Sequence, residues 1–188
     1  MSQNTPTVNS TYSQVTKHNN TKIISVDDIK NILTEVEYTT KARKVITLHD
    51  DFTEIPQRFV NCLHQHSYIS PHMHTDIKHW ELINLVYGDM YALIFSNDGI
   101  LLEKYHLTTN GIRIIEIHSN CYHTYVANTE SAFLEICNND YDINNPQAKR
   151  VNATWAAAEG SSQAIIYLDN LRSAKIGDNL SHMSNLSR

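Results

Sequence analysis

The chain has 188 residues, with 15 lysines and arginines against 20 aspartates and glutamates, and its formal net charge is -5 at pH 7. This balance does not give the basic surface by which proteins bind nucleic acids. No apolar run approaches the roughly 20 residues of a membrane span, and the polar start of the chain lacks the apolar core of a signal peptide. We therefore expect one folded domain in the cytoplasm, with neither nucleic acid nor a membrane as partner.

The N-terminal region predicts a polar arm followed by one helix. Residues 1–20 are rich in Ser, Thr, Asn and Gln, so they cannot bury enough apolar surface to offset the cost of ordering, and we predict that they are disordered. Ser25 followed three residues later by Asp28 matches a capping box, and apolar residues then recur at helical spacing. The sequence predicts an amphipathic helix over residues 26–41, packed on the outside of the domain.

From residue 44 onward the apolar pattern changes to a period of two, which is typical of β-strands. Gly88-Asp89 and Asn97-Asp98-Gly99 are hairpin turns by composition, because Gly and Asn tolerate positive φ. Closely spaced hairpins leave no room for crossover helices, so the pattern predicts an all-β antiparallel barrel or sandwich. The predicted strands are residues 44–48, 58–63, 67–72, 80–87, 90–96, 100–106, 112–117, 123–127 and 132–137.

The alternation ends after Cys137, where a polar loop begins. After a stop signal at Gly160, Ser161 or Ser162 can cap a short helix that runs through Leu171. Residues 172–188 turn polar again, which predicts a frayed tail. The expected organisation is therefore a folded domain over residues 21–171 between two polar ends.

A cluster of histidines is the strongest chemical signal. His72 and His74 lie two residues apart in an extended segment, so their imidazoles share one face. Glu81 follows on the next apolar run, and His123 starts a later strand. Neutral imidazoles and a carboxylate are typical ligands of divalent Zn, Fe, Mn, Co or Ni. The alternative is that these are surface histidines of a chain that contains 11.

Other polar residues of the predicted strands can join this site. His79 shares the face of Glu81 and is a candidate to replace it or add to the ligand set. Arg58 can clamp a carboxylate or phosphate, and Tyr125 or Glu135 can pass a proton. We take these three as candidate catalytic residues. The alternative is that Arg58 and Glu135 pair with each other in a structural ion pair.

The histidine spacing resembles the two cupin motifs. The first reads His-x-His, three or four residues, Glu, six residues, Gly, and the gap from Glu81 to Gly88 fits it. The gap from His74 to Glu81 is longer than in the motif, so the loop before the strand must bulge. The second motif reads Pro-x-Gly-x-x-His and matches residues 118–123, with His118 in place of Pro and Asn120 in place of Gly. Asn is the best substitute for Gly where φ is positive, so we expect the turn to be kept.

More narrowly, the chain resembles the WbuC-family cupin fold metalloproteins over roughly residues 23–171. This resemblance implies a cupin-type antiparallel β-barrel (a double-stranded β-helix or jelly roll) with an N-terminal and a short C-terminal helix. It also implies the metal ligands His72, His74, Glu81 and His123, and that a homodimer can form. The matching segments are Pro56-Gln57-Arg58-Phe59, Ser67-Tyr68-Ile69-x-Pro71-His72-x-His74, Trp80-Glu81, His123-Thr124 and Trp155-Ala156-Ala157-x-Glu159-Gly160.

Three functions follow from these patterns. The first is a metal-dependent isomerase or epimerase acting on a small sugar or sugar-nucleotide-like substrate. WbuC-family genes occur in O-antigen clusters, so the resemblance places that reaction in bacterial surface polysaccharide biosynthesis. The second is an Fe(II) dioxygenase, and the third is a module that binds a metal or small ligand without turnover. The ligand set alone does not distinguish Fe, Zn, Mn or Ni.

Overall fold

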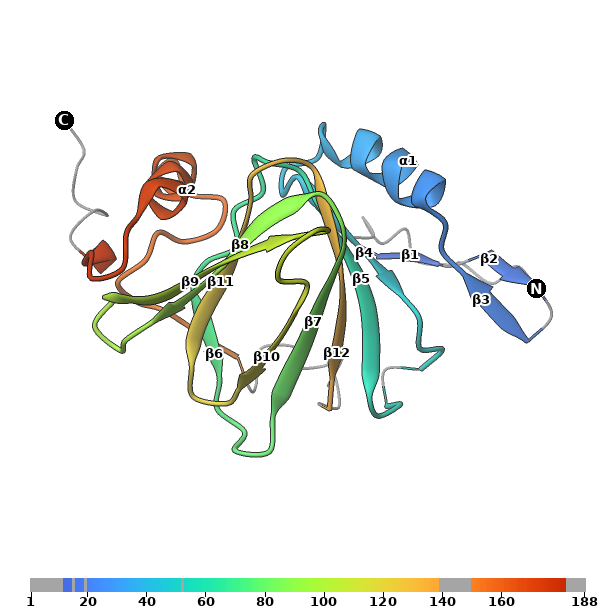
Figure 1. Cartoon of the computed structure of the whole chain (residues 1–188), viewed down its shortest axis with the longest axis horizontal. Coiled ribbons are helices and arrows are strands. Elements are labelled where there is room, and N and C mark those ends of the chain that lie inside the picture. The colour runs from blue at the N-terminus through green and yellow to red at the C-terminus, as the bar shows by residue number, and fades with distance from the viewer. Residues whose placement is uncertain (1–11, 15, 19, 52, 139–149, 182–188) are drawn as a thin grey trace, which may run out of the picture.

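The chain folds into two β-sheets that face each other as a cupin-type barrel, which confirms the predicted all-β class (Figure 1). The computed structural model describes residues 12–14, 16–18, 20–51, 53–138 and 150–181. The first sheet contains, in spatial order, β1 (Tyr12–Gln14), β4 (Arg43–Thr47), β5 (Gln57–Leu63), β12 (Ser131–Cys137), β7 (Trp80–Tyr87) and β10 (Ile114–His118). The second contains β13 (Arg150–Asn152), β6 (His72–His74), β11 (Tyr122–Ala127), β8 (Asp89–Phe95) and β9 (Leu101–Thr108).

Buried residues form three apolar layers. The inward faces of the two sheets meet in a barrel core that includes Leu85, Met90 and Phe133. A second cluster lies between the first sheet and helix α1 (Val26–Val36). A third lies between the second sheet and helix α2 (Ala164–Ser173), so each helix covers the outer face of one sheet. Several strands are therefore buried on both faces, one against the barrel core and one against a helix.

Helix α1 begins as the sequence predicts. Ser25 Oγ accepts a hydrogen bond from Asp28 N at 3.2 Å, and Ser25 N donates to Asp28 Oδ2 at 2.7 Å, which completes the capping box. The helix ends at Val36, earlier than the predicted residue 41, because the following residues turn back toward β4. Thr39 N donates to the Val36 carbonyl, and Ala42 has a φ of 49°.

One predicted strand is largely wrong. Residues 67–71 are not part of a strand, and β6 begins only at His72. Their polar groups bond to other partners: the Tyr68 carbonyl accepts from Arg43 Nη1 at 2.8 Å, and Tyr68 Oη donates to the Ala157 carbonyl at 2.6 Å. Pro71 also has no N–H for a strand ladder. The other eight predicted strands lie within about two residues of observed ones.

The two ends of the chain differ from the predicted polar ends. Most of residues 1–20 and 182–188 lie outside the described residues. Within the predicted arm, Tyr12–Gln14 pairs with β4, and Thr16–His18 (β2) pairs with β3 (Thr21–Ile23). At the other end, Leu180 is fully buried in the cluster beneath α2, and its N–H donates to the Gly99 carbonyl at 2.8 Å. The packed C-terminal segment thus extends past the predicted boundary at residue 171.

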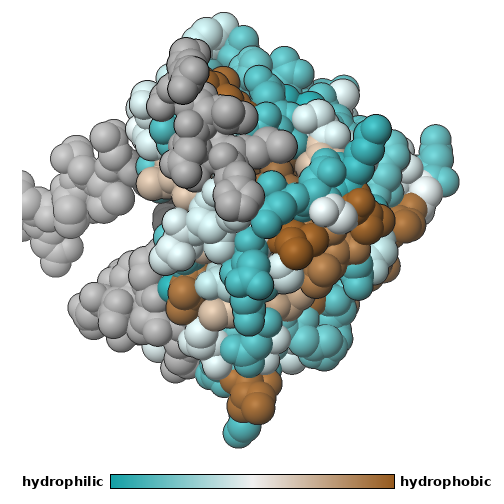
Figure 2. Space-filling view, turned by 90° about the vertical axis from the view of Figure 1, so that its left-hand side faces the viewer, coloured by the Kyte–Doolittle hydropathy of each residue, from teal (hydrophilic) through white to brown (hydrophobic). Residues whose placement is uncertain are grey.

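The outer surface over α2 is mixed in character. Figure 2 shows this side of the molecule as mainly hydrophilic, with bands of apolar residues. Helix α2 buries Tyr167, Leu168 and Leu171 but exposes Ile165 and Ile166. Among the described residues, no helix combines the length and apolar character needed to cross a membrane.

Candidate metal centre

The candidate ligands come from three strands and meet inside one end of the barrel. His72 and His74 belong to β6, and His123 on β11 lies directly opposite His72 in the antiparallel pair. Glu81 comes from β7 in the other sheet, where it points inward with Ile83 and Leu85. The side chains of both sheets thus converge, and His72, Glu81 and His123 are buried.

Backbone carbonyls fix the orientation of two imidazoles. His72 Nδ1 lies 3.0 Å from the Ser70 carbonyl oxygen, and His123 Nδ1 lies 2.9 Å from the Cys121 carbonyl oxygen. Because a carbonyl only accepts, each Nδ1 carries the hydrogen, and each Nε2 keeps its lone pair. This is the arrangement by which proteins orient metal-ligating histidines.

Glu81 lies at the centre of the cluster. Its Oε1 is 2.9 Å from His74 Nε2, and its Oε2 is 3.1 Å from His123 Nε2. Burial alone would raise the pKa of Glu81, but its contacts with His123, His74 and His79 outweigh this and hold the pKa well below its usual range. Burial lowers the pKa of His72 and His74. These shifts favour neutral His72 and His74 beside an ionised Glu81, the protonation states that metal ligands require.

His79 lies beside both His74 and Glu81. Its ring stacks on that of His74 with 4.0 Å between centroids, and its Nε2 is 3.4 Å from Glu81 Oε1. In the described part of the chain, two triads have all their ligand atoms within 4.8 Å of one another: His72/His74/His123 and His74/His79/Glu81. His74 is the member that both triads share.

Several buried histidine nitrogens of this cluster lack a hydrogen-bond partner among the described residues. Among the described residues, neither ring nitrogen of His74 or His79, nor Nε2 of His123, has a partner in hydrogen-bond geometry, although the three Nε2 atoms approach Glu81. Buried polar atoms without partners are costly and rare. A divalent first-row transition metal would satisfy these nitrogen lone pairs, so the residues present fit such an ion.

The long gap between His74 and Glu81 forms a loop that is hydrogen-bonded to the turn between β10 and β11. His79 N donates to the Asp76 carbonyl at 2.8 Å, and the His79 carbonyl accepts from Ser119 N at 3.0 Å. Asn120 N donates to the His74 carbonyl at 2.7 Å, and Asn120 has a φ of 59°. The prediction that Asn takes the place of the motif's Gly at positive φ is therefore confirmed.

Tyr125 and Glu135 lie deeper in the same interior. Tyr125 follows His123 on the inward face of β11, and Glu135 lies on β12 opposite Ile83 of β7. Glu135 Oε2 accepts a hydrogen bond from Asn61 Nδ2 at 2.8 Å. Burial and then the charge of Glu81 raise the pKa of Glu135 to about 8. The structure thus brings these two candidates to the metal site.

Arg58 is not brought to this site. It lies opposite Ile136 on the face of β5 that also carries Val60 and Cys62, which is the outer face, and it pairs with Glu54 rather than with Glu135. The candidate role of Arg58 is therefore corrected.

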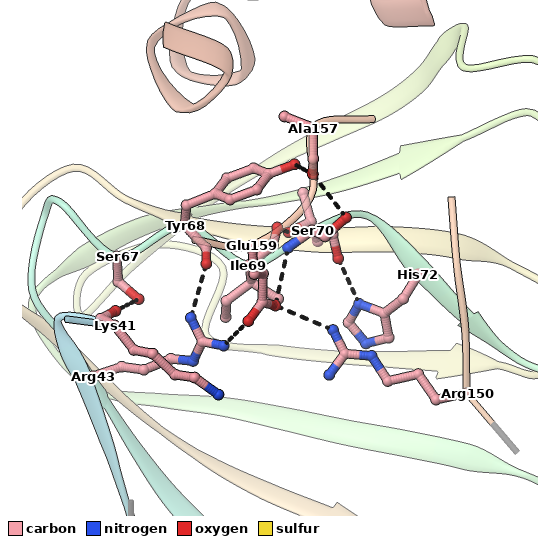
Figure 3. A network of polar contacts seen from close by, with 11 residues as sticks. Lys41, Arg43, Ser67, Tyr68, Ile69, Ser70, His72, Arg150, Ala157 and Glu159 are labelled. Atoms are coloured by element: carbon pink, nitrogen blue, oxygen red, sulfur yellow. Dashed lines mark hydrogen bonds and ion pairs between the residues drawn. The ribbon is translucent and has the colours of Figure 1, made fainter. Parts of the chain in front are cut away.

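A different arginine, Arg150, lies near the histidines and was not a sequence candidate. It is directly opposite His74 in the β13–β6 pair. Figure 3 shows its guanidinium beside His72 and directed at Glu159, which Arg43 contacts from the other side. The three residues of β13 (Arg150–Asn152) show no apolar periodicity in the sequence. Arg150 is located near the histidines by the pairing of β13 with β6, which the sequence does not reveal.

Comparisons with known proteins agree with the fold. Residues 24–107 match the model of a family described as a domain of unknown function, DUF6016. No curated protein matches the chain. Among solved structures, CapF bound to the inhibitor 3-isopropenyl-tropolone is similar with a TM-score of 0.50 and 16% identity, covering 60% of this chain and 32% of CapF. This chain therefore spans about a third of the length of CapF.

Two further solved structures are more distant. An uncharacterized Klebsiella pneumoniae protein with a double-stranded β-helix domain has a TM-score of 0.48 and 12% identity, covering 73% of this chain and 96% of its own. KdgF from Halomonas sp. has a TM-score of 0.41 and 13% identity, covering 52% of this chain and 80% of its own. The CapF match supports the cupin-type fold, and the chain combines that fold with a candidate His/Glu metal site.

Proposed function

We propose that this protein is a metal-dependent enzyme that moves a proton on a small polar substrate of the sugar or sugar-nucleotide type. The observation that carries the proposal is the continuity of the interior, where a buried cluster of metal-ligand residues adjoins Glu135 and Tyr125. A site built only to hold a metal needs no second carboxyl group beside its ligands. The proposal therefore favours catalysis over binding without turnover.

The residues divide into two groups by what they can do. His72, His74, Glu81 and His123 would hold the ion, and His79 lies close enough to add to them. A bound divalent ion would polarise a carbonyl or hydroxyl oxygen of the substrate.

Proton transfer would fall to the second group. The Glu135 carboxyl is held by Asn61 Nδ2 and can take a proton from the substrate or return one. The Tyr125 hydroxyl lies near Glu81 but has no partner in hydrogen-bond geometry among the described residues, so it would contact a substrate oxygen beside the metal. An isomerase or epimerase uses these two abilities together.

The substrate class rests on the resemblance to WbuC-family cupins, whose genes occur in O-antigen clusters. We extend this context to the present chain and infer a role in bacterial surface polysaccharide biosynthesis.

Proton exchange is the sharpest test. The protein, loaded in turn with Fe(II), Mn(II), Ni(II) and Zn(II), is incubated in D2O with a panel of sugar nucleotides, and the sugar protons are followed by NMR. We expect deuterium to enter one carbon position, with a loss of about 100-fold or more in Glu135→Gln.

Other outcomes of this experiment would overturn the proposal. Oxygen uptake with Fe(II) and no exchange would support the dioxygenase instead. A sugar nucleotide that binds and is recovered unchanged with every metal would support a binding module.

A further inference from the structure

Two arginines approach Glu159, and their remaining bonds differ. Arg43 is satisfied: its Nη1 donates to the Tyr68 carbonyl at 2.8 Å, and its Nη2 is 2.5 Å from Glu159 Oε2. Among the described residues, Arg150 makes a single long contact, from Nη2 to Glu159 Oε1 at 3.5 Å. Its Nε is buried and has no hydrogen-bond partner among the described residues. Most of the donors of the Arg150 guanidinium thus have no hydrogen-bond partner within the part of the chain that the structure describes.

The position of Arg150 connects these donors to the metal centre. In an antiparallel pair, directly opposite residues project to the same side of the sheet, so Arg150 lies on the side of His74. The charge of Arg150 acts on His72, Glu81 and Glu135. Figure 3 shows the guanidinium next to the His72 ring, which comes from the strand that holds two candidate ligands.

With a metal ion bound, the net charge of the side chains and the ion in this interior would be positive. Arg43 and Arg150 face the single carboxylate of Glu159. A divalent ion in the candidate centre would face the single carboxylate of Glu81. Positive charge therefore exceeds negative charge, and it still does so if Glu135 is ionised. An anion that enters the barrel is attracted on both counts.

We propose that Arg150 is a substrate-binding residue that receives a carboxylate or phosphate group of the substrate beside the metal. A planar guanidinium with free donors binds either group through two parallel hydrogen bonds, which a neutral substrate cannot accept. The inference rests on the proposed function for the existence of a substrate. It narrows that substrate to an anionic one, such as a sugar acid or a sugar phosphate.

The test follows the Arg150 side chain directly. The Nε–H signal of Arg150 is assigned in the NMR spectrum of the full zinc-loaded chain by its absence in Arg150→Lys. Glucuronate, glucose 1-phosphate and neutral glucose are then titrated separately. We expect the signal to shift and saturate with one of the anionic probes but not with glucose. The probe that binds distinguishes a carboxylate from a phosphate.

Variants establish that Arg150 causes the preference. In Arg150→Gln we expect the affinity for the anionic probe, measured by calorimetry, to fall about 10- to 100-fold while metal content is unchanged. Arg150→Lys keeps the charge but loses the planar fork, so its affinity should fall less. Arg58→Gln, the same change on the outer face of the barrel, should bind the probe as the unaltered protein does.

Three results would overturn the inference. In the first, the anionic probes bind no better than glucose at millimolar concentration. In the second, the Arg150 Nε–H signal does not shift when they are added. In the third, Arg150→Gln binds the anionic probe with the same affinity as the unaltered protein. If metal binds and proton exchange is seen alongside any of these, only the role of Arg150 fails. If the protein binds no metal, the proposed function and this inference fail together.

Discussion

The two ends of the barrel interior share the same strands but differ in chemistry. On β7, inward-facing Glu81 is followed toward the other end by Leu85, and on β11 His123 is followed by Ala127. On β12, Phe133 fills the apolar end. The apolar end, which contains Leu85, Ala127 and Phe133, is thus a close-packed core of the kind that stabilises folds. The polar end, which contains Glu81 and His123, is a cluster of buried polar groups, several of which have no hydrogen-bond partner among the described residues. The difference indicates that the apolar end stabilises the barrel, whereas the polar end carries the function that we propose.

Truncation at the apolar end should have the largest effect on stability. Phe133→Ala removes a fully buried ring and should lower the free energy of unfolding by about 3–5 kcal/mol. Urea unfolding measures the loss. The comparison predicts that the molecules that remain folded still bind one equivalent of metal. A loss of metal binding without a loss of stability would contradict the division between the two ends.

Glu159 pairs with Arg43 on β4 and with Arg150 on β13, so its removal should have an intermediate effect on the free energy of unfolding. Burial by itself would raise the pKa of Glu159, but Arg43 and Arg150 hold it below its usual value. Because the folded pKa is the lower one, the carboxylate stabilises the fold above its ordinary pKa, and this stability is lost as the pH falls through the folded value. Glu159→Gln should cost about 1.5–3 kcal/mol at neutral pH.

The control for Glu159 is the pH dependence itself. The difference in unfolding free energy between Glu159→Gln and the unaltered protein should shrink as the solution is made more acidic. A difference that stays constant with pH would show that the lost stability comes from packing and not from the ion pairs.

Glu135 should give the opposite sign of pH dependence. Its pKa is about 8 in the folded protein, above the ordinary value of 4.5, because of burial and then the charge of Glu81. The contribution of Glu135 to stability is therefore fully present below about 4.5 and lost as the pH rises toward 8. Glu135→Gln should flatten the unfolding free energy of the metal-free protein across this range.

Chemical denaturation of both proteins at several pH values measures this slope. Glu130→Gln, at the hairpin before β12, is a matched control that should keep the original slope. If the slopes of Glu135→Gln and the unaltered protein coincide, Glu135 is ionised in the fold at neutral pH.

Arg58 should give the smallest effect. Its ion pair with Glu54 is on the outer face and partly exposed to solvent. Arg58→Gln should change the free energy of unfolding by at most about 1 kcal/mol and leave metal affinity unaltered. Calorimetric titration with Zn(II) measures the affinity. A weakened metal site in this variant would mean that the outer face is coupled to the polar end.

Much of this arrangement could be predicted from the sequence, because local patterns specify it. The shared face of His72 and His74 follows from their His-x-His spacing, and the capping box at Ser25 locates the start of α1. Asn120 supplies the positive φ that the turn before His123 requires. Each of these depends on residues close together in the chain.

The remaining features depend on tertiary contacts. Arg58 and Asn61 alternate on β5, but both faces of this strand are covered, one by α1 and one by the barrel core, so apolar pattern does not reveal which face is inward. His79 precedes β7, and its position is set by a loop held to Ser119. Arg150 reaches the site only because β13 pairs with β6.

The most direct test of the account is the metal content and affinity of the polar end. Protein purified without a histidine tag is analysed for its elements, and Zn(II) affinity is compared among the unaltered chain, His74→Ala, His79→Ala and His123→Ala. We predict one divalent ion per chain, and a loss of more than about 100-fold in affinity for His74→Ala and His123→Ala, with folded barrels in both. His79→Ala should lose less, since His79 Nε2 lies 3.4 Å from Glu81, farther than the Nε2 atoms of His74 and His123, which lie at 2.9 and 3.1 Å. Equal metal content in all four proteins, or none in any, would contradict the account.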